Sequence, residues 1–348
     1  MCQTESTERY YAMKNPNIVF TAPCVAEVIE KEIPTCGDNE VLIEIAVTSI
    51  SAGTERANLI GDPNISYGSA PKVVFPRQLG YSAGGTVVAV GKAVNAVNPG
   101  DRVACSWTKH SKYCVLKAEQ VYRLPDNISF SEAALVHIAT FPLAAIRKCE
   151  LELGESAIVM GQGILGQIAV KLLRAAGAAP IIAVDPVAAK REQALLLGAD
   201  YALDPFAEDF AATVKRITCG GASVAIEVTG KGAGLDGVLD CMRQFGRVAL
   251  LGCTRSSDFS IDYYRKVHGP GITLIGAHTM ARPKRESHGG WWTEKDDAEA
   301  LIRLISVGRL DLGSMVEEIH SPMEAPEIFG RLATNAHFPI VQFDWTLV

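Results

Sequence analysis

The sequence lacks the long apolar run that a membrane-spanning helix requires, although 48% of its 348 residues are hydrophobic. Its first residues, Met1–Arg9, lack the basic-then-apolar order of a secretory signal peptide. The formal net charge of −6 gives no reason to expect nucleic acid or an anionic membrane as a partner. Internal repeats and low-complexity segments are also absent. These absences favour a cytoplasmic protein that acts on a small molecule.

The cysteines are not arranged for structural cross-linking. No two of them are spaced as Cys-x-x-Cys, and their number, nine, is odd. A disulfide framework and a thiolate zinc cluster are therefore not expected, and most of these residues should be small buried hydrophobic side chains. They occupy positions 2, 24, 36, 105, 114, 149, 219, 241 and 253.

A glycine-rich loop is the most informative feature that is present. An apolar stretch at 156–160 predicts a strand before it, and apolar residues at helical spacing from 165 to 176 predict a helix after it. In this context a G-x-G-x-x-G loop binds the pyrophosphate of a dinucleotide, because glycine permits the tight turn, the approach of the phosphates and the close packing of the helix. The residues are Gly161, Gln162, Gly163, Ile164, Leu165 and Gly166.

A carboxylate follows the next predicted strand at the spacing that a ribose-binding residue requires. The apolar strand 181–184 ends in Asp185, which lies 19 residues after Gly166. Such a carboxylate accepts hydrogen bonds from the ribose hydroxyls and repels a 2′-phosphate, which favours NAD(H) over NADP(H). Two alternatives stay open here: Asp185 caps the following helix, and Lys190 is either a second ribose contact or a solvated lysine.

The length and the order of predicted elements indicate two domains. Short strands separated by turns fill the first ~145 residues, whereas strands and helices alternate from ~150 to ~280, as in a doubly wound parallel sheet. We assign residues 1–146 and 285–348 to a β-rich domain and residues 147–284 to the dinucleotide-binding domain. Strands are predicted at 41–47, 85–91, 102–104, 113–116, 224–228, 247–252, 272–276 and 340–343, and helices at 132–148, 188–198 and 295–307.

Four further motifs accompany the glycine loop at 161–166. They are Ala52-Gly53-Thr54-Glu55, Leu79-Gly80-Tyr81-Ser82-Ala83-Gly84-Gly85, Pro99-Gly100-Asp101-Arg102-Val103 and Leu197-Gly198-Ala199-Asp200. With these motifs, nearly the whole chain resembles the medium-chain dehydrogenase/reductase superfamily. The resemblance implies an α/β protein with a Rossmann domain and a β-rich, GroES-like catalytic domain. The Gly-Tyr-Ser and Ala-Gly-Thr-Glu variants are most similar to a zinc-free branch often labelled bacteriochlorophyllide (hydroxyethyl) dehydrogenase-like.

The chain departs from this family at the positions where relatives bind zinc. The resemblance implies that Ala52, Tyr81 and Phe141 stand where zinc members have their three catalytic ligands. Only the phenol of Tyr81 has any capacity as a ligand. The four-cysteine loop that carries a structural zinc in relatives is also missing after residue 104. We therefore expect no catalytic metal at the usual site.

Without zinc, hydride transfer still needs a group that handles the proton of the substrate oxygen. The resemblance implies that Thr54 replaces the hydroxyl that binds the substrate alcohol, with Glu55 beside it. Tyr81, His110 and His137 are the other catalytic candidates, since a phenol or an imidazole can move a proton. Alternatively, Tyr81 fills the volume of the lost metal site, Thr54 is a turn hydroxyl and both histidines are structural.

Two further regions are candidate ligand contacts. The loops after later strands of the parallel sheet, Thr229-Gly230 and Gly252-Cys253, should line the cofactor. The paired Trp291 and Trp292 are suited, if exposed, to stacking on a sugar ring, and they suit a subunit contact equally well.

The sequence thus favours a zinc-independent, NAD-dependent oxidoreductase that interconverts a secondary alcohol and a ketone, with a sugar or polyol as the preferred substrate. A quinone or enone reductase that uses NAD(P)H is the first alternative, and a catalytically silent dinucleotide-binding protein is the second. The predicted edge strand at 272–276 indicates a homodimer or homotetramer by family analogy.

Overall fold

The computed structural model describes residues 14–65, 73–256, 259–335 and 337–348, so the expectation for Met1–Arg9 lies outside the described residues. The chain folds into two compact units. Unit 1 comprises residues 1–137, 302–306 and 312–348, and unit 2 comprises residues 138–301 and 307–311. The divisions at 137/138 and 301/302 fall inside two continuous helices, α3 (Phe130–Lys148) and α8 (Glu294–Ser306), whereas the sequence-based boundaries lie at 146/147 and 284/285.

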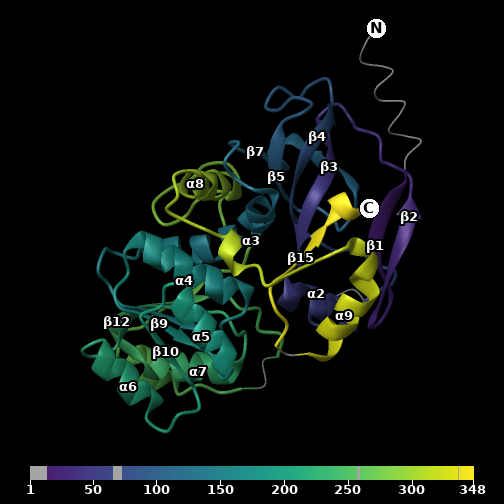
Figure 1. Cartoon of the computed structure of the whole chain (residues 1–348). Helices are drawn as coiled ribbons and strands as arrows, with labels where there is room; N and C mark the ends of the chain where they lie inside the picture. The colour runs from purple at the N-terminus through teal and green to yellow at the C-terminus, as the bar shows by residue number, and fades with distance from the viewer. Residues whose placement is uncertain (1–13, 66–72, 257–258, 336) are drawn as a thin grey trace. The chain divides into compact units, whose positions relative to one another are not determined.

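Unit 1 is built on a sheet with the order β14-β15-β3-β4-β5-β7, in which β6 also pairs with β3. Figure 1 labels β15, β3, β4, β5 and β7 of this sheet. The parallel pairing of β14 with β15 is the exception in an otherwise antiparallel sheet. A separate antiparallel pair, β1–β2, precedes it. The strands are β1 (Asn15–Ala22), β2 (Val25–Lys31), β3 (Glu40–Ser49), β4 (Ser82–Val90), β5 (Arg102–Ser106), β6 (Tyr113–Lys117), β7 (Val121–Arg123), β14 (Glu318–His320) and β15 (Val341–Asp344).

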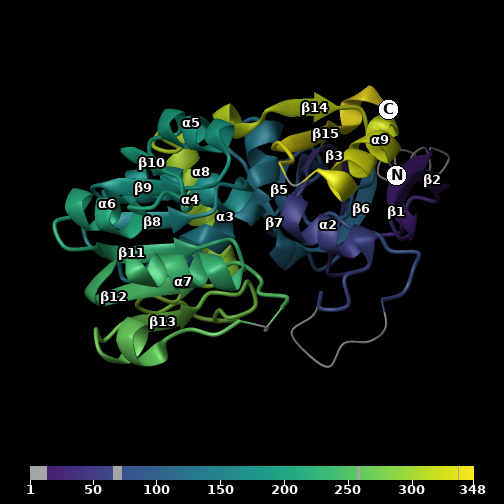
Figure 2. The same cartoon turned by 90° about the horizontal axis from the view of Figure 1, so that it is seen from below.

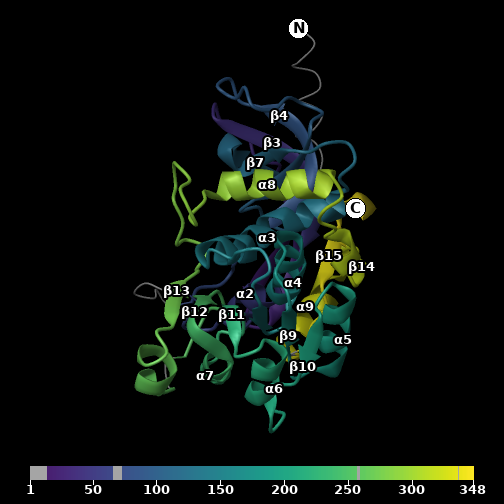
Figure 3. The same ribbon diagram turned by 90° about the vertical axis from the view of Figure 1, so that its left-hand side faces the viewer.

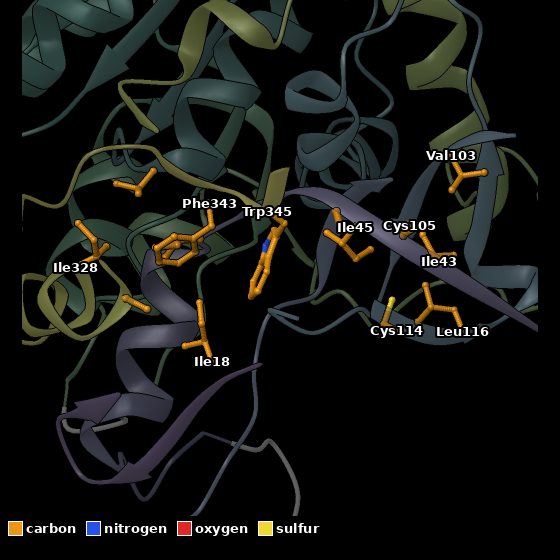
Figure 4. Close-up of a cluster of buried hydrophobic side chains, with 14 of the residues drawn as sticks. Ile18, Ile43, Ile45, Val103, Cys105, Cys114, Leu116, Ile328, Phe343 and Trp345 are labelled. Carbon is orange, nitrogen blue, oxygen red and sulfur yellow. The ribbon is translucent and has the colours of Figure 1, made fainter. Parts of the chain in front are cut away.

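The core of unit 1 joins segments that are distant in the sequence. Ile18 of β1, Ile43 of β3, Ile328 of helix α9 (Ala325–Thr334) and Phe343 of β15 belong to one buried cluster (Figure 4). Trp345, in the short helix η5 (Trp345–Leu347), is 0% exposed in the same cluster. Each such side chain contributes about 1.5–3 kcal/mol through burial, so the C-terminal segment is an integral part of this unit.

Two helices of unit 1 begin differently from the sequence-based expectation. Residues 52–60 form helix α2 (Ala52–Ile60), which begins after Ser51 and ends at Gly61, so Thr54 lies in a helix and not in a turn. Helix α3 begins at Phe130, where the Ser129 hydroxyl accepts a hydrogen bond from the backbone N–H of Glu132, 3.2 Å away. The Glu132 carboxylate accepts in return from the backbone N–H of Ser129, which completes a capping box.

Unit 2 contains the predicted parallel sheet, with the strand order β10-β9-β8-β11-β12-β13 (Figure 2). The order reverses between β8 and β11, which is the topological switch point of a doubly wound sheet. β13 is the outermost strand beside β12 (Figure 3). The strands are β8 (Ala157–Met160), β9 (Ile181–Val184), β10 (Tyr201–Leu203), β11 (Ala222–Glu227), β12 (Met242–Leu250) and β13 (Thr273–Gly276).

The helices of unit 2 cover this sheet. α4 packs on β8 and β9, α5 on β9 and β10, and α7 on β8, β11 and β12. β8 and β9 are buried at every position, which explains why both are uniformly apolar in the sequence. The helices are α4 (Ile164–Ala176), α5 (Ala188–Leu196), α6 (Phe210–Ile217) and α7 (Gly232–Asp240), with the short π turn η2 (Tyr264–His268). The short 3₁₀ turns η1 (Ala118–Gln120), η3 (Gly313–Met315) and η4 (Pro322–Glu324) belong to unit 1.

Among the described residues, no helix is both long enough and apolar enough to cross a bilayer.

Candidate functional site

The glycine loop of unit 2 has the geometry that a bound pyrophosphate requires. Gly161 has φ +100°, a backbone conformation that glycine adopts without strain. A Cβ at Gly166 would lie 1.9 Å from the carbonyl oxygen of Gly161, so the helix packs directly on the loop. A Cβ at Gly163 would meet no atom within 4 Å, which leaves the backbone open to a ligand. Each of the three glycines therefore has a separate physical reason for its presence.

The loop leads into the N-terminus of α4, which has no side-chain cap. Gly163 is the N-cap residue, and the first hydrogen bond of the helix joins the N–H of Gln167 to the carbonyl of Gly163. The N–H groups of Ile164, Leu165 and Gly166 therefore have no partner within the helix. Together with the positive end of the helix dipole they suit an anion such as a pyrophosphate.

Asp185 braces this loop from the end of β9. Its Oδ2 accepts a hydrogen bond from the N–H of Gln162 (2.9 Å), and its Oδ1 accepts one from the N–H of Val187 (2.9 Å). The side chain of Gln162 is fully buried and donates to the carbonyl of Val159 (3.1 Å). The carboxylate thus links the glycine loop to the start of α5, and it remains 7% exposed beside the loop.

A basic residue that the sequence analysis did not consider stands near Asp185. Arg191 donates from one guanidinium nitrogen to the carbonyls of Asp185 (2.8 Å) and Pro186 (2.9 Å) and to Asp204 Oδ2 (3.2 Å). Its charge is therefore paired with a carboxylate. Lys190 lies one residue earlier, half-buried in the first turn of α5.

The loops after β11 and β12 lie against each other. A Cβ at Gly230 would come within 2.5 Å of the Cys253 carbonyl oxygen, and a Cβ at Gly252 within 2.3 Å of the N–H of Gly230. A Cβ at Gly161 would approach the Thr229 methyl group to 3.0 Å, so the glycine loop adjoins the same cluster. The predicted cofactor residues of the parallel strands are thus brought together at one edge of the sheet.

Glu227, which the sequence analysis missed, organises this cluster. Its buried carboxylate accepts hydrogen bonds from the N–H (2.8 Å) and the hydroxyl of Thr229 and from the N–H of Gly230 (3.2 Å). Burial raises the pKa of Glu227, although these hydrogen bonds oppose the shift. The sequence held a signal for this role: Glu227 is a carboxylate at the end of an apolar strand, directly before the loop that was expected to line the cofactor.

In unit 1, Glu55 and His110 meet in a buried hydrogen-bond chain. His110 Nε2 lies 2.9 Å from Glu55 Oε2, and His110 Nδ1 lies 2.8 Å from the hydroxyl of Thr48. That hydroxyl accepts from the indole N–H of Trp345 (2.9 Å), and Glu55 Oε1 accepts from the N–H of Ser51 (2.8 Å). Because the indole only donates, the Thr48 proton is available for Nδ1, and the Nε2 proton then goes to Glu55.

This chain is closed to solvent. Glu55 and Thr48 are 0% exposed and His110 is 1% exposed, with Phe329 and Phe343 against the imidazole ring. Both ring nitrogens of His110 and both carboxylate oxygens of Glu55 have hydrogen-bond partners within unit 1. The arrangement stabilises the fold of the unit.

Tyr81 and His137, the other predicted proton carriers of unit 1, lie together in an aromatic cluster with Trp107. The ring centroids of Tyr81 and His137 are 5.7 Å apart, and those of Trp107 and His137 are 4.7 Å apart. Trp107 has φ +58°, a backbone conformation that is strained for a bulky residue, and its N–H donates to the Tyr81 carbonyl (2.8 Å). Thr54 is half-buried in the first turn of α2.

The paired tryptophans of unit 2 are half-buried rather than exposed, because each covers a basic side chain at the end of α3. The Arg147 guanidinium lies 3.6 Å from the ring centroid of Trp292, and the Lys148 ammonium lies 4.5 Å from that of Trp291. Such cation–π contacts hold both rings against their own unit.

Among residues 14–65, 73–256, 259–335 and 337–348, no three side chains of His, Cys, Asp or Glu come together as a ligand set. Where zinc-binding relatives are expected to have ligands, this chain has Ala52, Tyr81 and Phe141. A methyl group, a phenol and a phenyl ring do not make a zinc site.

Two family models match the chain. The model described as the alcohol dehydrogenase GroES-like domain matches residues 37–142, and the one described as zinc-binding dehydrogenase matches residues 165–288. The fold therefore combines a GroES-like domain with a parallel-sheet Rossmann domain, as the sequence predicts.

Characterised relatives align over most of the chain at low identity. D-guloside 3-dehydrogenase of Escherichia coli is 26% identical over 332 residues, which cover 90% of this chain and 94% of that protein. L-threonine 3-dehydrogenase of Pyrococcus abyssi is 28% identical over 330 residues, covering 86% and 89% respectively. The expected likeness to the bacteriochlorophyllide-type branch has no support among these relatives.

A solved structure confirms the fold. Galactitol-1-phosphate dehydrogenase from Escherichia coli superimposes with a TM-score of 0.83 and 20% sequence identity, covering 95% of this chain and all of that one.

Proposed function

Because the chain belongs to the medium-chain, zinc-type alcohol dehydrogenase-like family, we propose that it is an NAD(H)-dependent oxidoreductase that interconverts a secondary alcohol and a ketone without zinc. The observation that carries this proposal is the glycine loop, where a Cβ at Gly163 would meet no atom within 4 Å. The carboxylate of Asp185 accepts a hydrogen bond from the N–H of Gln162 in the same loop. The family uses nicotinamide dinucleotides, and the loop, the helix N-terminus and the Thr229–Gly230 turn fit such a cofactor.

The preference for NAD(H) is supported by the charges beside the loop. The Asp185 carboxylate would repel a 2′-phosphate, and the nearby Arg191 guanidinium is already paired with Asp204. Zinc independence is supported by the unsuitable side chains of Ala52, Tyr81 and Phe141 at the expected ligand positions.

A nicotinamide dinucleotide held by the loop at 161–166 and the Thr229–Gly230 turn would supply the hydride acceptor for oxidation of the carbinol carbon. The chain itself must then orient the substrate oxygen and take up its proton. Tyr81 is the strongest candidate, because it is half-buried whereas the His137 ring that it contacts is 1% exposed. The half-buried Thr54 of α2 is the second candidate. Glu55 and His110 serve this site as a buried support and not as proton carriers.

Removing the phenol of Tyr81 should separate proton handling from cofactor binding. We expect Tyr81→Phe to lower kcat about 10²–10⁴-fold, the usual contribution of a positioned acid or base, and to leave the Kd for NADH unchanged. Tyr113→Phe is the matched control, because that phenol belongs to unit 1 and bonds to Glu44 (3.3 Å). Equal kcat in Tyr81→Phe and wild type would assign the proton step to another residue.

The names of two relatives support a proposal for the substrate class. The names of D-guloside 3-dehydrogenase and L-threonine 3-dehydrogenase both specify oxidation at carbon 3, a secondary alcohol in each. We propose a hydroxylated small molecule, with sugars and polyols as the first compounds to test.

The test of the proposed function combines turnover with metal analysis. Purified protein is assayed with NAD⁺ and a panel of sugars, polyols and hydroxy acids, and with NADH or NADPH and ketones or enones. Oxidation of a secondary alcohol by a metal-free sample supports the proposal. Reduction of an enone alone would make the chain a C=C reductase, binding of NADH without any turnover would make it a silent binder, and stoichiometric zinc would overturn zinc independence.

A homo-oligomer is proposed from the free edge of the parallel sheet. β13 ends the strand order, and its Thr273 and Leu274 side chains are exposed, so a second copy can pair with this edge. We expect Leu274→Lys to convert a dimer into a monomer in light scattering after gel filtration. Ile319→Lys, on the edge strand β14, is the matched control, and dissociation by both variants or by neither would contradict pairing through β13.

A further inference from the structure

Lys148, the last residue of α3, is bound on three sides within unit 2. Its ammonium group donates to the carbonyl of Gly276 (3.1 Å) and to that of Ala281 (2.6 Å), and it lies 4.5 Å from the ring centroid of Trp291. An ammonium group has three N–H donors, and two carbonyls and an aromatic face use all of them. The residue is 6% exposed.

The two carbonyls belong to a single short segment. Gly276 ends β13, and residues 276–281 turn through His278, whose carbonyl accepts from the N–H of Ala281 (2.8 Å). His278 Nδ1 also accepts from the N–H of Met280 (3.2 Å). Lys148 therefore ties together both ends of the segment that leaves the carboxyl end of β13.

This segment adjoins the loops assigned to the cofactor. The N–H of Ala277 donates to the carbonyl of Leu250 (3.1 Å), at the end of β12 and two residues before Gly252. The carboxyl ends of parallel strands form one edge of the sheet, and ligands bind along that edge in this fold. The residues after β13 extend the cluster of Thr229–Gly230 and Gly252–Cys253 in the direction away from the ribose-binding end.

We propose that Lys148 is a positioning residue, whose protonated side chain holds segment 276–281 in the conformation that dinucleotide binding requires and releases it when the proton is lost. The inference rests on the proposed dinucleotide function. A neutral amine would keep two N–H donors and direct a lone pair at a carbonyl oxygen or at the ring face, so one of the three contacts would become repulsive.

Burial makes this proton easy to lose. Burial first, and then the charge of the Arg282 guanidinium, lower the pKa of Lys148 to about 8, although Asp297 and Cys149 oppose the shift. The other groups around it are Arg147, which pairs with Asp297 (2.8 Å), and His278, whose pKa is also lowered by burial and by Lys148. His278 is therefore neutral throughout the range in which Lys148 titrates.

Cofactor affinity should consequently fall in mild alkali. If only protein with protonated Lys148 binds NADH, about one molecule in eleven can bind at one pH unit above the pKa. The Kd for NADH should therefore rise about tenfold between pH 7 and pH 9. By reciprocity, binding near pH 8.5 should take up protons, which calorimetry in two buffers measures. Proton uptake of zero would overturn the inference.

Global stability should change in the opposite direction. Because the pKa of Lys148 is lower in the folded protein than in the unfolded chain, its burial costs stability below pH 8, and that cost is relieved between pH 8 and about 10.5. The difference in unfolding free energy between wild type and Lys148→Met should therefore move in favour of wild type as pH rises through this window. A parallel loss of affinity and stability would indicate unfolding instead of release of the segment.

The decisive experiment compares Lys148→Arg and Lys148→Met with wild type from pH 6.5 to 9.5. Lys148→Arg should keep tight NADH binding at every pH, and Lys148→Met should bind weakly at every pH. Lys171→Met is the matched control, since that half-buried lysine of α4 pairs with Asp311 (4.0 Å) and its pKa is also lowered by burial. It should retain the wild-type pH profile, and a flat profile in wild type would overturn the inference.

Tryptophan emission of the cofactor-free protein provides a readout that does not depend on the proposed function. Since Lys148 faces the Trp291 ring, wild type should show an emission change with a midpoint near pH 8 that is missing in Lys148→Met. If the emission change is observed but NADH does not bind, the proposed function is contradicted, whereas the contact of Lys148 with segment 276–281 is still supported. NADH binding without this titration would contradict the inference alone.

Discussion

Replacing His110 by alanine is expected to lower the free energy of unfolding by about 1–3 kcal/mol, the usual cost of leaving buried polar groups without a hydrogen-bond partner. The Glu55 carboxylate, at 0% exposure, would keep only the hydrogen bond from the N–H of Ser51, and the hydroxyl of Thr48 would lose its imidazole partner. Urea denaturation followed by tryptophan fluorescence measures the change, and Trp345 reports directly on this hydrogen-bond chain.

His320→Ala is the matched control for this loss. His320 also pairs with carboxylates, Glu318 (2.8 Å) and Glu324 (2.9 Å), but its side chain is 21% exposed. Exposed pairs contribute about 0–1 kcal/mol, so the control should remain close to wild type in stability. If His110 moved the substrate proton instead, His110→Ala would lose kcat while the midpoint of unfolding stayed unchanged.

The contrast between these histidines shows which features the sequence could predict. The glycine loop and Asp185 were predictable because their relations are local: a strand, a turn and a helix follow one another within a single βαβ unit. The burial of Glu55 and His110 depends on contacts across 55 residues of sequence, and the bond from Trp345 to Thr48 spans 297 residues. No periodicity or spacing encodes contacts of that range.

The same reason explains the tryptophan pair and helix α2. The sequence suggests that the rings of Trp291 and Trp292 are free to stack on a sugar or to contact another subunit. In the structure, Lys148 and Arg147, which lie over 140 residues earlier, pack on these rings. Helix α2 begins with alanine and glycine and lacks a regular apolar stripe, so only its packing in unit 1 makes it a helix. The sequence predicts which loops meet at one edge of the parallel sheet, and it cannot separate catalytic from supporting polar residues.

Asp185→Asn and Asp185→Ala are expected to reduce the preference for NADH over NADPH on the order of 100-fold. Two unit charges about 4 Å apart interact by about 4 kcal/mol near a protein surface, and removing the carboxylate charge relieves that repulsion against a 2′-phosphate. The Kd for NADPH should therefore decrease, and the Kd for NADH should increase because the ribose hydroxyls lose a charged acceptor. Fluorescence titration of each variant with both nucleotides measures the change.

The two substitutions also separate the charge of Asp185 from its support of the loop. Its carboxylate accepts from the N–H groups of Gln162 and Val187, and an asparagine retains one oxygen to accept one of these bonds, whereas alanine retains none. Asp185→Asn should therefore change cofactor preference with a smaller loss of stability than Asp185→Ala, and Asp185→Ala should weaken the binding of both nucleotides further by loosening the glycine loop. A wild-type preference for NADPH would contradict the role of Asp185, and it would make the enone reductase the better assignment for this chain.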